Sequence, residues 1–112
     1  MDHTITEEGN LVVVALKGDI DLQYSPKARD VLLEAAGDAH GVVVDMSGVG
    51  MIDSSGVASL LEAFQTCRNR GKGFVLAAAD EPVFRVLKLA RLDTVFEIAE
   101  DLEKARKLLA EK

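Results

Sequence analysis

The chain has 112 residues, of which 48% are hydrophobic, and its net charge is −6 from 19 acidic and 13 basic residues. This length and composition predict a single folded domain over residues 1–112 and not a disordered segment. The acidic balance argues against a nucleic-acid binder or a protein adsorbed on an anionic membrane, because both need a basic contact surface.

The sequence shows no signal for export or membrane insertion. Met1 is followed by polar and acidic residues, which predicts no signal peptide, and no apolar run approaches the roughly 18 residues that span a bilayer. The single Cys67 cannot form an internal disulfide, as is usual in a reducing compartment. We therefore expect a cytoplasmic protein without membrane insertion.

The first two predicted elements are strands joined by a tight turn. His3–Glu7 has the length of a short edge strand, and Glu8–Asn10 has the composition of a turn. Leu11–Lys17 is an almost unbroken apolar run that ends at Gly18, which indicates a strand covered on both faces. Because the connection is so short, the two strands should pair antiparallel.

The first predicted helix opens at Ser25. Ser25 suits the N-cap and Pro26 the first helical position, while Gly37 or Gly41 would end the segment. The apolar residues at helical spacing are Ala28, Val31, Leu32, Ala35 and Ala36.

The middle of the chain predicts a strand, a loop and a second helix. Val42–Val44 is the most strand-like triplet, with Asp45 at its carboxyl end and Ser47–Gly50 as a loop. The helix starts near Ser55 and ends before Gly71. Its apolar stripe consists of Val57, Leu60, Leu61, Phe64 and Cys67.

The last third predicts a strand, a helix, a strand and a helix. Phe74–Ala79 and Thr94–Ile98 have strand character, Asp80–Pro82 opens the third helix, and Asp101 caps the fourth. The inward residues are Val83, Val86, Leu87 and Ala90 in the third helix, and Leu102, Ala105, Leu108 and Leu109 in the fourth.

The order β-β-α-β-α-β-α-β-α predicts an α/β fold. Strands that alternate with helices form right-handed crossovers and a mixed, mostly parallel sheet, here of four to five strands with about four helices. The residues that follow the parallel strands should meet at the carboxyl edge of the sheet, where open α/β proteins build their sites.

Most of the usual catalytic groups are poorly placed for chemistry. His3 and His40 lie in a terminal strand and a turn, and neither has a neighbour at metal-ligand spacing. Cys67 lies on an apolar helix face, where we expect a buried, inert thiol. The chain has no glycine-rich phosphate loop and no GxSxG nucleophile motif. We therefore expect no enzyme activity, no catalytic residue, no metal and no cofactor.

Asp45 raises the alternative of a receiver domain, which takes a phosphoryl group on an aspartate at a strand end. Such a domain also needs adjacent acids after its first strand and a lysine after its last parallel strand. Asp19 and Asp21 are separated by Ile20, and no lysine lies in 98–100. We interpret Asp45 instead as an acceptor of hydrogen bonds from nearby loop amides.

Asp53-Ser54-Ser55-Gly56, at the start of the second helix, supports two interpretations. Asp and Ser are the best N-caps, so the stretch is compatible with a plain helix cap. Three adjacent residues qualify where one suffices, and Gly56 is a poor helix former that would let another group approach the backbone. A hydroxyl at a helix N-terminus is also well placed to carry a phosphate.

Three long stretches resemble the STAS domain family, and within it the small single-domain anti-sigma factor antagonists of bacteria. They are GDIDLQYSPKARDVLLEA (Gly18–Ala36), VVVDMSGVGMIDSSGVASLLEA (Val42–Ala63) and Arg70–Ala105. The resemblance implies that Ser54, the first serine after the aspartate, is the phosphorylation site. Asp53, Ser55 and Gly56 would support it.

The resemblance also implies partners and a contact surface. The kinase would be the partner anti-sigma factor, which has a histidine-kinase-like ATPase fold, and a PP2C-type phosphatase would remove the phosphate. The unphosphorylated antagonist would bind the anti-sigma factor and free the sigma factor. Asp19 and Asp21 would contact the partner. Tyr24 stands where the family more often has a small residue, so it would tune partner choice.

Two other functions remain as alternatives. One is a STAS scaffold subunit of a transporter or signalling assembly that is never phosphorylated. The other is a regulatory domain that binds a nucleotide at the DSSG edge, although the chain lacks a phosphate loop.

Overall fold

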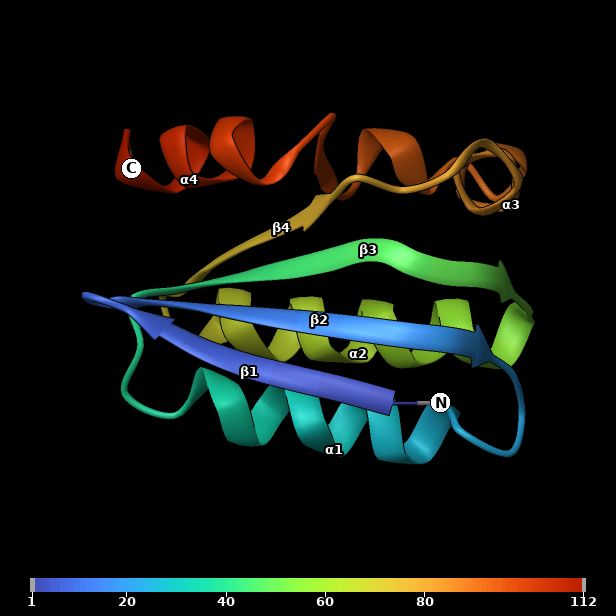
Figure 1. The fold of residues 1–112 in the computed structure, drawn as a ribbon, viewed down its shortest axis with the longest axis horizontal. Helices are drawn as coiled ribbons and strands as arrows, with labels where there is room; N and C mark the ends of the chain where they lie inside the picture. Colours follow the sequence, from blue (N-terminus) through green and yellow to red (C-terminus); the bar gives the residue numbers. More distant parts are fainter. Residues whose placement is uncertain (1, 112) are drawn as a thin grey trace.

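The computed structural model describes residues 2–111 and places a five-stranded sheet between helices (Figure 1). The predicted order of strands and helices is confirmed, with one additional 3₁₀ helix. In chain order the elements are β1 (Asp2–Glu8), β2 (Leu11–Ile20), α1 (Ser25–Ala36), β3 (Gly41–Ile52), α2 (Ser54–Asn69), β4 (Gly73–Ala77), α3 (Glu81–Leu89), η1 (Leu92–Thr94), β5 (Glu97–Ala99) and α4 (Leu102–Ala110). Within residues 2–111, no helix combines the length and the apolar character that a membrane crossing requires.

The strands lie in the order β1-β2-β3-β4-β5, and only β1 runs antiparallel to its neighbour. This confirms the predicted mixed, mostly parallel sheet. Gly9, with a φ of +64°, allows the tight turn between β1 and β2. Because β2, β3, β4 and β5 are parallel, their carboxyl ends lie at one edge of the sheet, and the loops that follow them meet there.

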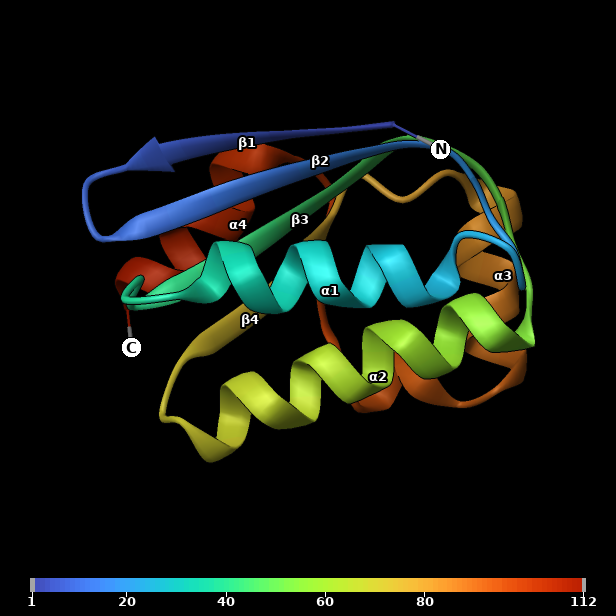
Figure 2. The same ribbon diagram turned by 90° about the horizontal axis from the view of Figure 1, so that it is seen from below.

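Alternate residues of the central strands face two separate apolar cores. One face packs against α1, α2 and α3, and the other packs against α4. The helices α1 and α2 lie side by side across the first face (Figures 1 and 2). The second core consists of Val13, Val43, Val75, Ala77, Ala99, Ala105 and Leu109. The prediction that the strand beginning at Leu11 is covered on both faces is therefore confirmed.

The strands β2 and β3 run further than the sequence predicts. β2 continues past Gly18 to Ile20, and β3 continues through the expected glycine loop to Ile52, with register shifts along the pair. Gly18 has a φ of +104°, and a Cβ on Gly48 would lie 3.0 Å from the Leu16 carbonyl oxygen. Both glycines therefore permit bulges and close strand approach instead of ending the strands.

Asp45 consequently lies inside β3 and not at a strand end, which corrects the predicted placement. Its Oδ1 accepts a hydrogen bond of 3.0 Å from the Ser47 amide. The expected bond to a nearby amide is present, but the amide belongs to the strand. Because β3 continues beyond Asp45, the residues that follow the end of this strand begin at Asp53.

The helix boundaries agree with the predictions except at the start of α1. Tyr24 is the N-cap there, without a side-chain capping bond, and Ser25 is the buried first helical residue. Gly37, with a φ of +31°, ends α1, and Gly71, with a φ of +72°, follows α2. The carboxylate of Asp101 caps α4 as predicted.

Three predictions in the last third of the chain were wrong. β4 ends at Ala77 and not at Ala79, because Ala78 takes a φ of +59° that a strand cannot hold. The predicted strand Thr94–Ile98 is shifted to β5, because η1 occupies the residues before it. Ala90, predicted to face inward, is the exposed C-cap of α3.

An ion pair ties α4 to the edge strand β1. Arg106 donates from Nε to Glu8 Oε1 at 2.6 Å and from Nη2 to Glu8 Oε2 at 3.0 Å. The hydrogen bond from Arg106 holds the pKa of Glu8 below its ordinary value of 4.5. The pair therefore stabilises the fold at a pH above 4.5, and this contribution is lost as the pH falls through the lower pKa of Glu8 in the folded chain.

We expect Glu8→Gln to lower the melting temperature by a few degrees at pH 7, because the double hydrogen bond to Arg106 is lost. The difference from the unsubstituted chain should shrink as the pH falls from 4.5 through the lower pKa that Glu8 has in the folded chain. Thermal unfolding followed by circular dichroism between pH 3 and 7 would measure this. The matched control is the exposed neighbour Glu7, and a Glu7→Gln effect of equal size would contradict the prediction.

Candidate functional site

Asp53 organises the junction between β3 and α2. It is the N-cap of α2, and its Oδ1 accepts hydrogen bonds from the Gly56 amide at 3.0 Å and the Ser55 hydroxyl at 2.6 Å. Its Oδ2 accepts a bond of 3.2 Å from the Leu22 amide, in the loop after β2. One carboxylate thus joins the start of α2 to the β2–α1 loop.

These donors also keep Asp53 ionised. The hydrogen bond from the Ser55 hydroxyl is the main cause that lowers the pKa of Asp53 below its ordinary value of 3.8, and the Gly56 amide adds to it. The Asp53 backbone amide lies 3.3 Å from the Ile20 carbonyl oxygen, to which it donates. Asp53 therefore contacts the end of β2 through its backbone amide, and the β2–α1 loop and α2 through its side chain.

The two serines differ in their surroundings. Ser54 is the exposed first residue of α2, and its hydroxyl has no hydrogen-bond partner among residues 2–111. Ser55 is half-buried, and its hydroxyl donates to Asp53. The free Ser54 hydroxyl stands at the positive end of a sixteen-residue helix, where the helix dipole favours an added anion. Ser54 is therefore the serine that is accessible for modification.

Gly56 is needed for packing inside the chain. A Cβ there would overlap the Ile20 carbonyl oxygen and would lie 2.7 Å from Ile52 Cγ1. The sequence interpretation expected a group to approach the backbone at this glycine, and the end of β2 is such a group. This close contact fixes the distance between the start of α2 and the strand pair.

The three predicted contact residues, at the end of β2 and in the β2–α1 loop, differ in their surroundings. Oδ1 of Asp21 accepts hydrogen bonds from the amides of Gln23 and Tyr24, both at 3.1 Å, so this carboxylate orders its own turn. Asp19 is exposed, and a Cβ on Gly50 would lie 3.5 Å from its Oδ1. Tyr24 is half-buried. Of the three, Asp19 presents the most accessible side chain.

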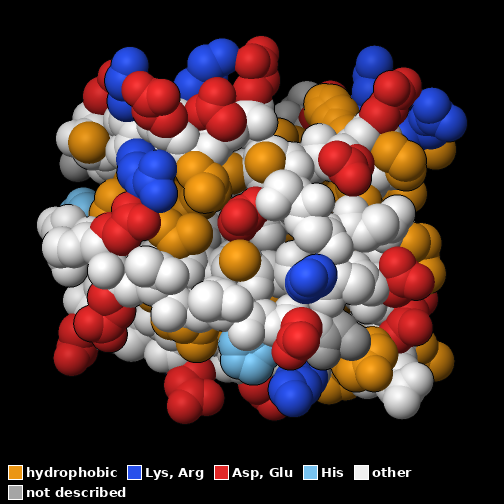
Figure 3. Space-filling view, viewed as in Figure 1, with side chains coloured by type: hydrophobic (Ala, Val, Ile, Leu, Met, Phe, Trp, Pro, Cys, Tyr) orange, Lys and Arg blue, Asp and Glu red, His pale blue; other side chains and the backbone are white. Residues whose placement is uncertain are grey.

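Sequence reasoning missed two exposed apolar residues beside these groups. Leu22 is 76% exposed and its amide donates to Asp53, while Met51 is 42% exposed and lies two residues before Asp53. We call Asp19, Leu22, Met51 and Ser54 the candidate surface. At the right edge of Figure 3, where β2 and β3 end in Figure 1, hydrophobic and acidic side chains lie next to one another. The signal that could have revealed Leu22 is an apolar residue between two polar residues, Asp21 and Gln23, in a loop.

The cysteine and the two histidines differ in burial. Cys67 is buried, and burial raises the pKa of its thiol, so an unreactive thiol is expected. His40 is exposed and His3 is half-buried. Among residues 2–111, no group of three or more His, Cys, Asp or Glu side chains is arranged to hold a metal ion.

Residues 3–105 match the family model of the STAS domain. This chain belongs to the STAS domain family. A relative of this STAS domain, the anti-sigma-B factor antagonist of Listeria monocytogenes, is 29% identical over 87 residues, which are 76% of this chain and 75% of the relative.

Solved structures share the fold of this STAS domain. An anti-sigma factor antagonist from Mycobacterium paratuberculosis gives a TM-score of 0.89 at 22% identity, covering 97% of this chain and 93% of its own. The unphosphorylated anti-sigma factor antagonist SpoIIAA gives a TM-score of 0.82 at 17% identity, covering 99% of this chain and 98% of its own. The phosphorylated Bacillus SpoIIAA gives a TM-score of 0.72 at 17% identity, covering 95% of this chain and 97% of its own. A sulfate transporter family protein from Wolinella succinogenes gives 0.81 at 18% identity, with 96% and 93% covered.

Proposed function

We propose that this STAS domain is an anti-sigma factor antagonist whose binding is switched by phosphorylation of Ser54. The observation that carries the proposal is the exposed Ser54 hydroxyl, free of hydrogen bonds within residues 2–111, beside a Ser55 hydroxyl that is occupied. The name of the Listeria relative supports the class of partner. A single domain over residues 1–112 would carry this function in the cytoplasm and so regulate sigma-factor-dependent transcription.

In this proposal, the partners carry out both the phosphorylation and the dephosphorylation of Ser54. The anti-sigma factor, with its histidine-kinase-like ATPase fold, would transfer the phosphoryl group to Ser54, and a PP2C-type phosphatase would remove it. The antagonist itself needs no catalytic residue in this scheme. Its contribution is to present the candidate surface in one arrangement, which Asp53 holds by bonding both to α2 and to Leu22.

The test uses the purified chain, the cognate anti-sigma kinase and ATP, with the phosphate located by mass spectrometry. We expect one phosphate on Ser54, full incorporation in Ser55→Ala and none in Ser54→Ala. Incorporation that survives Ser54→Ala would falsify the site assignment. Ser55→Ala is the matched control because it removes a neighbouring hydroxyl that is already engaged with Asp53.

We also expect Leu22→Ala to weaken binding to the anti-sigma factor about tenfold. Burying a leucine side chain contributes about 1.5–3 kcal/mol, and truncation to alanine loses most of the contact area. Isothermal titration calorimetry with the unphosphorylated chain would measure the change. Leu89→Ala is the matched control, because Leu89 is 80% exposed but lies outside the candidate surface. Equal losses for both variants would contradict the role of Leu22.

A second candidate is a STAS scaffold in a membrane-transport assembly. The similarity to the fold of the Wolinella sulfate transporter family protein favours it. Affinity capture with the tagged chain from native cells would distinguish the two functions. Recovery of a transport protein in place of an ATPase kinase, together with the absence of phosphate on Ser54, would support the scaffold.

A further inference from the structure

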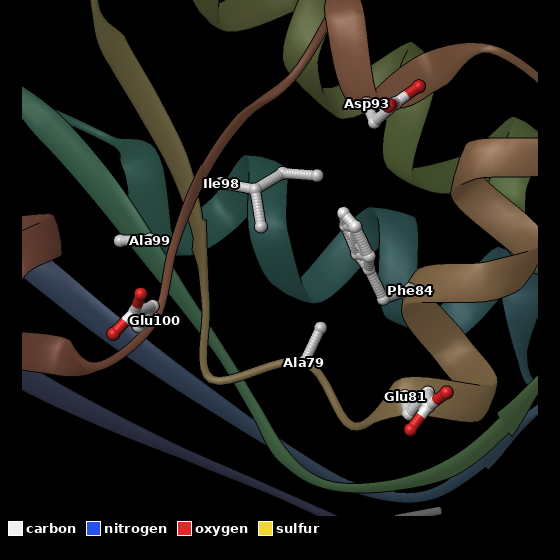
Figure 4. A pocket seen from close by; sticks show the side chains of 7 residues that line it. All are labelled: Ala79, Glu81, Phe84, Asp93, Ile98, Ala99 and Glu100. Carbon is white, nitrogen blue, oxygen red and sulfur yellow. The ribbon is translucent and has the colours of Figure 1, made fainter.

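A pocket of about 560 Å³ opens at the same sheet edge as the candidate surface, after the ends of β4 and β5. It is formed by the β4–α3 loop, α3, η1 and the end of β5 (Figure 4). None of its lining residues belongs to the candidate surface. Its volume is in the range of binding pockets, and neither the proposed phosphorylation nor the proposed partner contact uses it.

The floor of the pocket is apolar. Phe84 of α3 and Ile98 of β5 point toward one another across the pocket, with Ala79 of the β4–α3 loop beside them (Figure 4). All three side chains are only half-buried. The structure therefore leaves an aromatic ring and an aliphatic side chain open to a ligand.

The rim is acidic and incompletely neutralised. Glu81 pairs with Arg85 at 3.3 Å and Glu100 pairs with Lys104 at 2.7 Å, and the side chains of both pairs are largely exposed. Such exposed pairs are weak and exchange readily with an incoming cation. Asp93, the third carboxylate of the lining, is half-buried and has no ion-pair partner among residues 2–111. The rim thus holds one carboxylate more than the cations it pairs with.

We propose that this pocket binds an arginine or lysine side chain from a basic segment of a partner protein. The methylene stem would lie on Phe84 and Ile98, and the charged group would reach Asp93. A protruding segment fits better than a small molecule, because the carboxylates of Glu81 and Glu100 stand on the outside of the rim, at 84% and 82% side-chain exposure. The net charge of −6 would favour the approach of a basic partner.

The test is a nuclear magnetic resonance titration of the ¹⁵N-labelled full chain with the peptide acetyl-Ala-Arg-Leu-Arg-amide. We expect shift changes at the amides around Phe84, Asp93 and Ile98. The same peptide with citrulline for arginine, which has the shape but not the charge, should bind at least tenfold more weakly. Equal binding of the two peptides, or shifts centred outside the pocket, would overturn the proposal.

Two substituted chains and one small cation, agmatine, provide further tests of the proposed binding. Asp93→Asn should weaken binding of the arginine peptide about tenfold. The matched control is Glu34→Gln, which removes one negative charge from an exposed residue of α1 and should leave the affinity unchanged. Unchanged binding by Asp93→Asn would count against the proposal. Agmatine binding as tightly as the peptide would make this a small-molecule pocket and would also overturn it. Phosphorylation of Ser54 in Asp93→Asn should be normal, so the two proposals fail separately.

Discussion

Phosphorylation of Ser54 should weaken binding of the anti-sigma factor several hundred-fold and leave the melting temperature nearly unchanged. The phosphate adds about −1.5 to −2 charges at pH 7. At the N-terminus of α2 such an anion is tolerated or mildly favoured, by about 0.3–1 kcal/mol. The cost therefore falls on binding, where a hydrated dianion would have to enter a contact made for a hydroxyl. A cost of about 3–4 kcal/mol corresponds to this loss of affinity.

The same separation of binding from stability should be visible in a substituted chain. Ser54→Asp should also reduce the affinity for the anti-sigma factor measured by calorimetry. The reduction should be smaller than that caused by the phosphate, because the aspartate carries less charge. The melting temperature should change little. Ser55→Asp is the control, because it removes the hydroxyl that bonds to Asp53 and places a second carboxylate beside it. That variant should unfold at a lower temperature. A large drop in melting temperature for Ser54→Asp would instead favour a purely structural cap at this residue.

Gly56→Ala should destabilise the fold by about 1–2 kcal/mol net, although alanine is the better helix former. The helix preference of alanine contributes about 1 kcal/mol in its favour. The added Cβ, however, would overlap the Ile20 carbonyl oxygen and press on Ile52. Because a backbone atom cannot easily move aside, the overpacking should cost about 2–3 kcal/mol, which exceeds the helix preference of alanine. For a domain of this size the melting temperature should fall by roughly 5–15 °C.

Gly50→Ala is the matched control for this prediction. Its Cβ would meet only Asp19 Oδ1, at 3.5 Å, which is an ordinary contact. Thermal unfolding of the two variants should therefore differ clearly. A melting temperature of Gly56→Ala at or above that of the unsubstituted chain would mean that α2 does not need its close approach to β2. Displacement of α2 should also shift Asp53 away from Leu22, so partner binding should weaken in Gly56→Ala.

The order of the elements could be predicted because its signals are local. Apolar runs mark the central strands, and the aspartates before α2 and α4 cap helices whose apolar residues recur at helical spacing. The short turn at Gly9 is enough to make β1 antiparallel. For the same reason the stretch from Asp53 to Gly56 could be placed at the carboxyl edge of the sheet before the structure was known.

The details that could not be predicted depend on residues far apart in the chain. β3 continues through Gly48 because β2 pairs with it, and a single strand pattern cannot reveal that pairing. The need for glycine at position 56 comes from the Ile20 carbonyl oxygen of another strand. The difference in hydrogen bonding between Ser54 and Ser55 depends on the direction in which the Asp53 carboxylate points.

The position of α4 has a consequence for the synthesis of the protein. Within residues 2–111, the face of the sheet that carries Val13, Val43 and Val75 is covered by α4, which ends at Ala110. The Arg106–Glu8 pair joins residues 98 positions apart. While the chain is being made, these valines stay open to solvent until α4 has left the ribosome. We therefore expect nascent chains cut short before α4 to aggregate or to need a chaperone, whereas truncation within β1, at the edge of the sheet, should be milder.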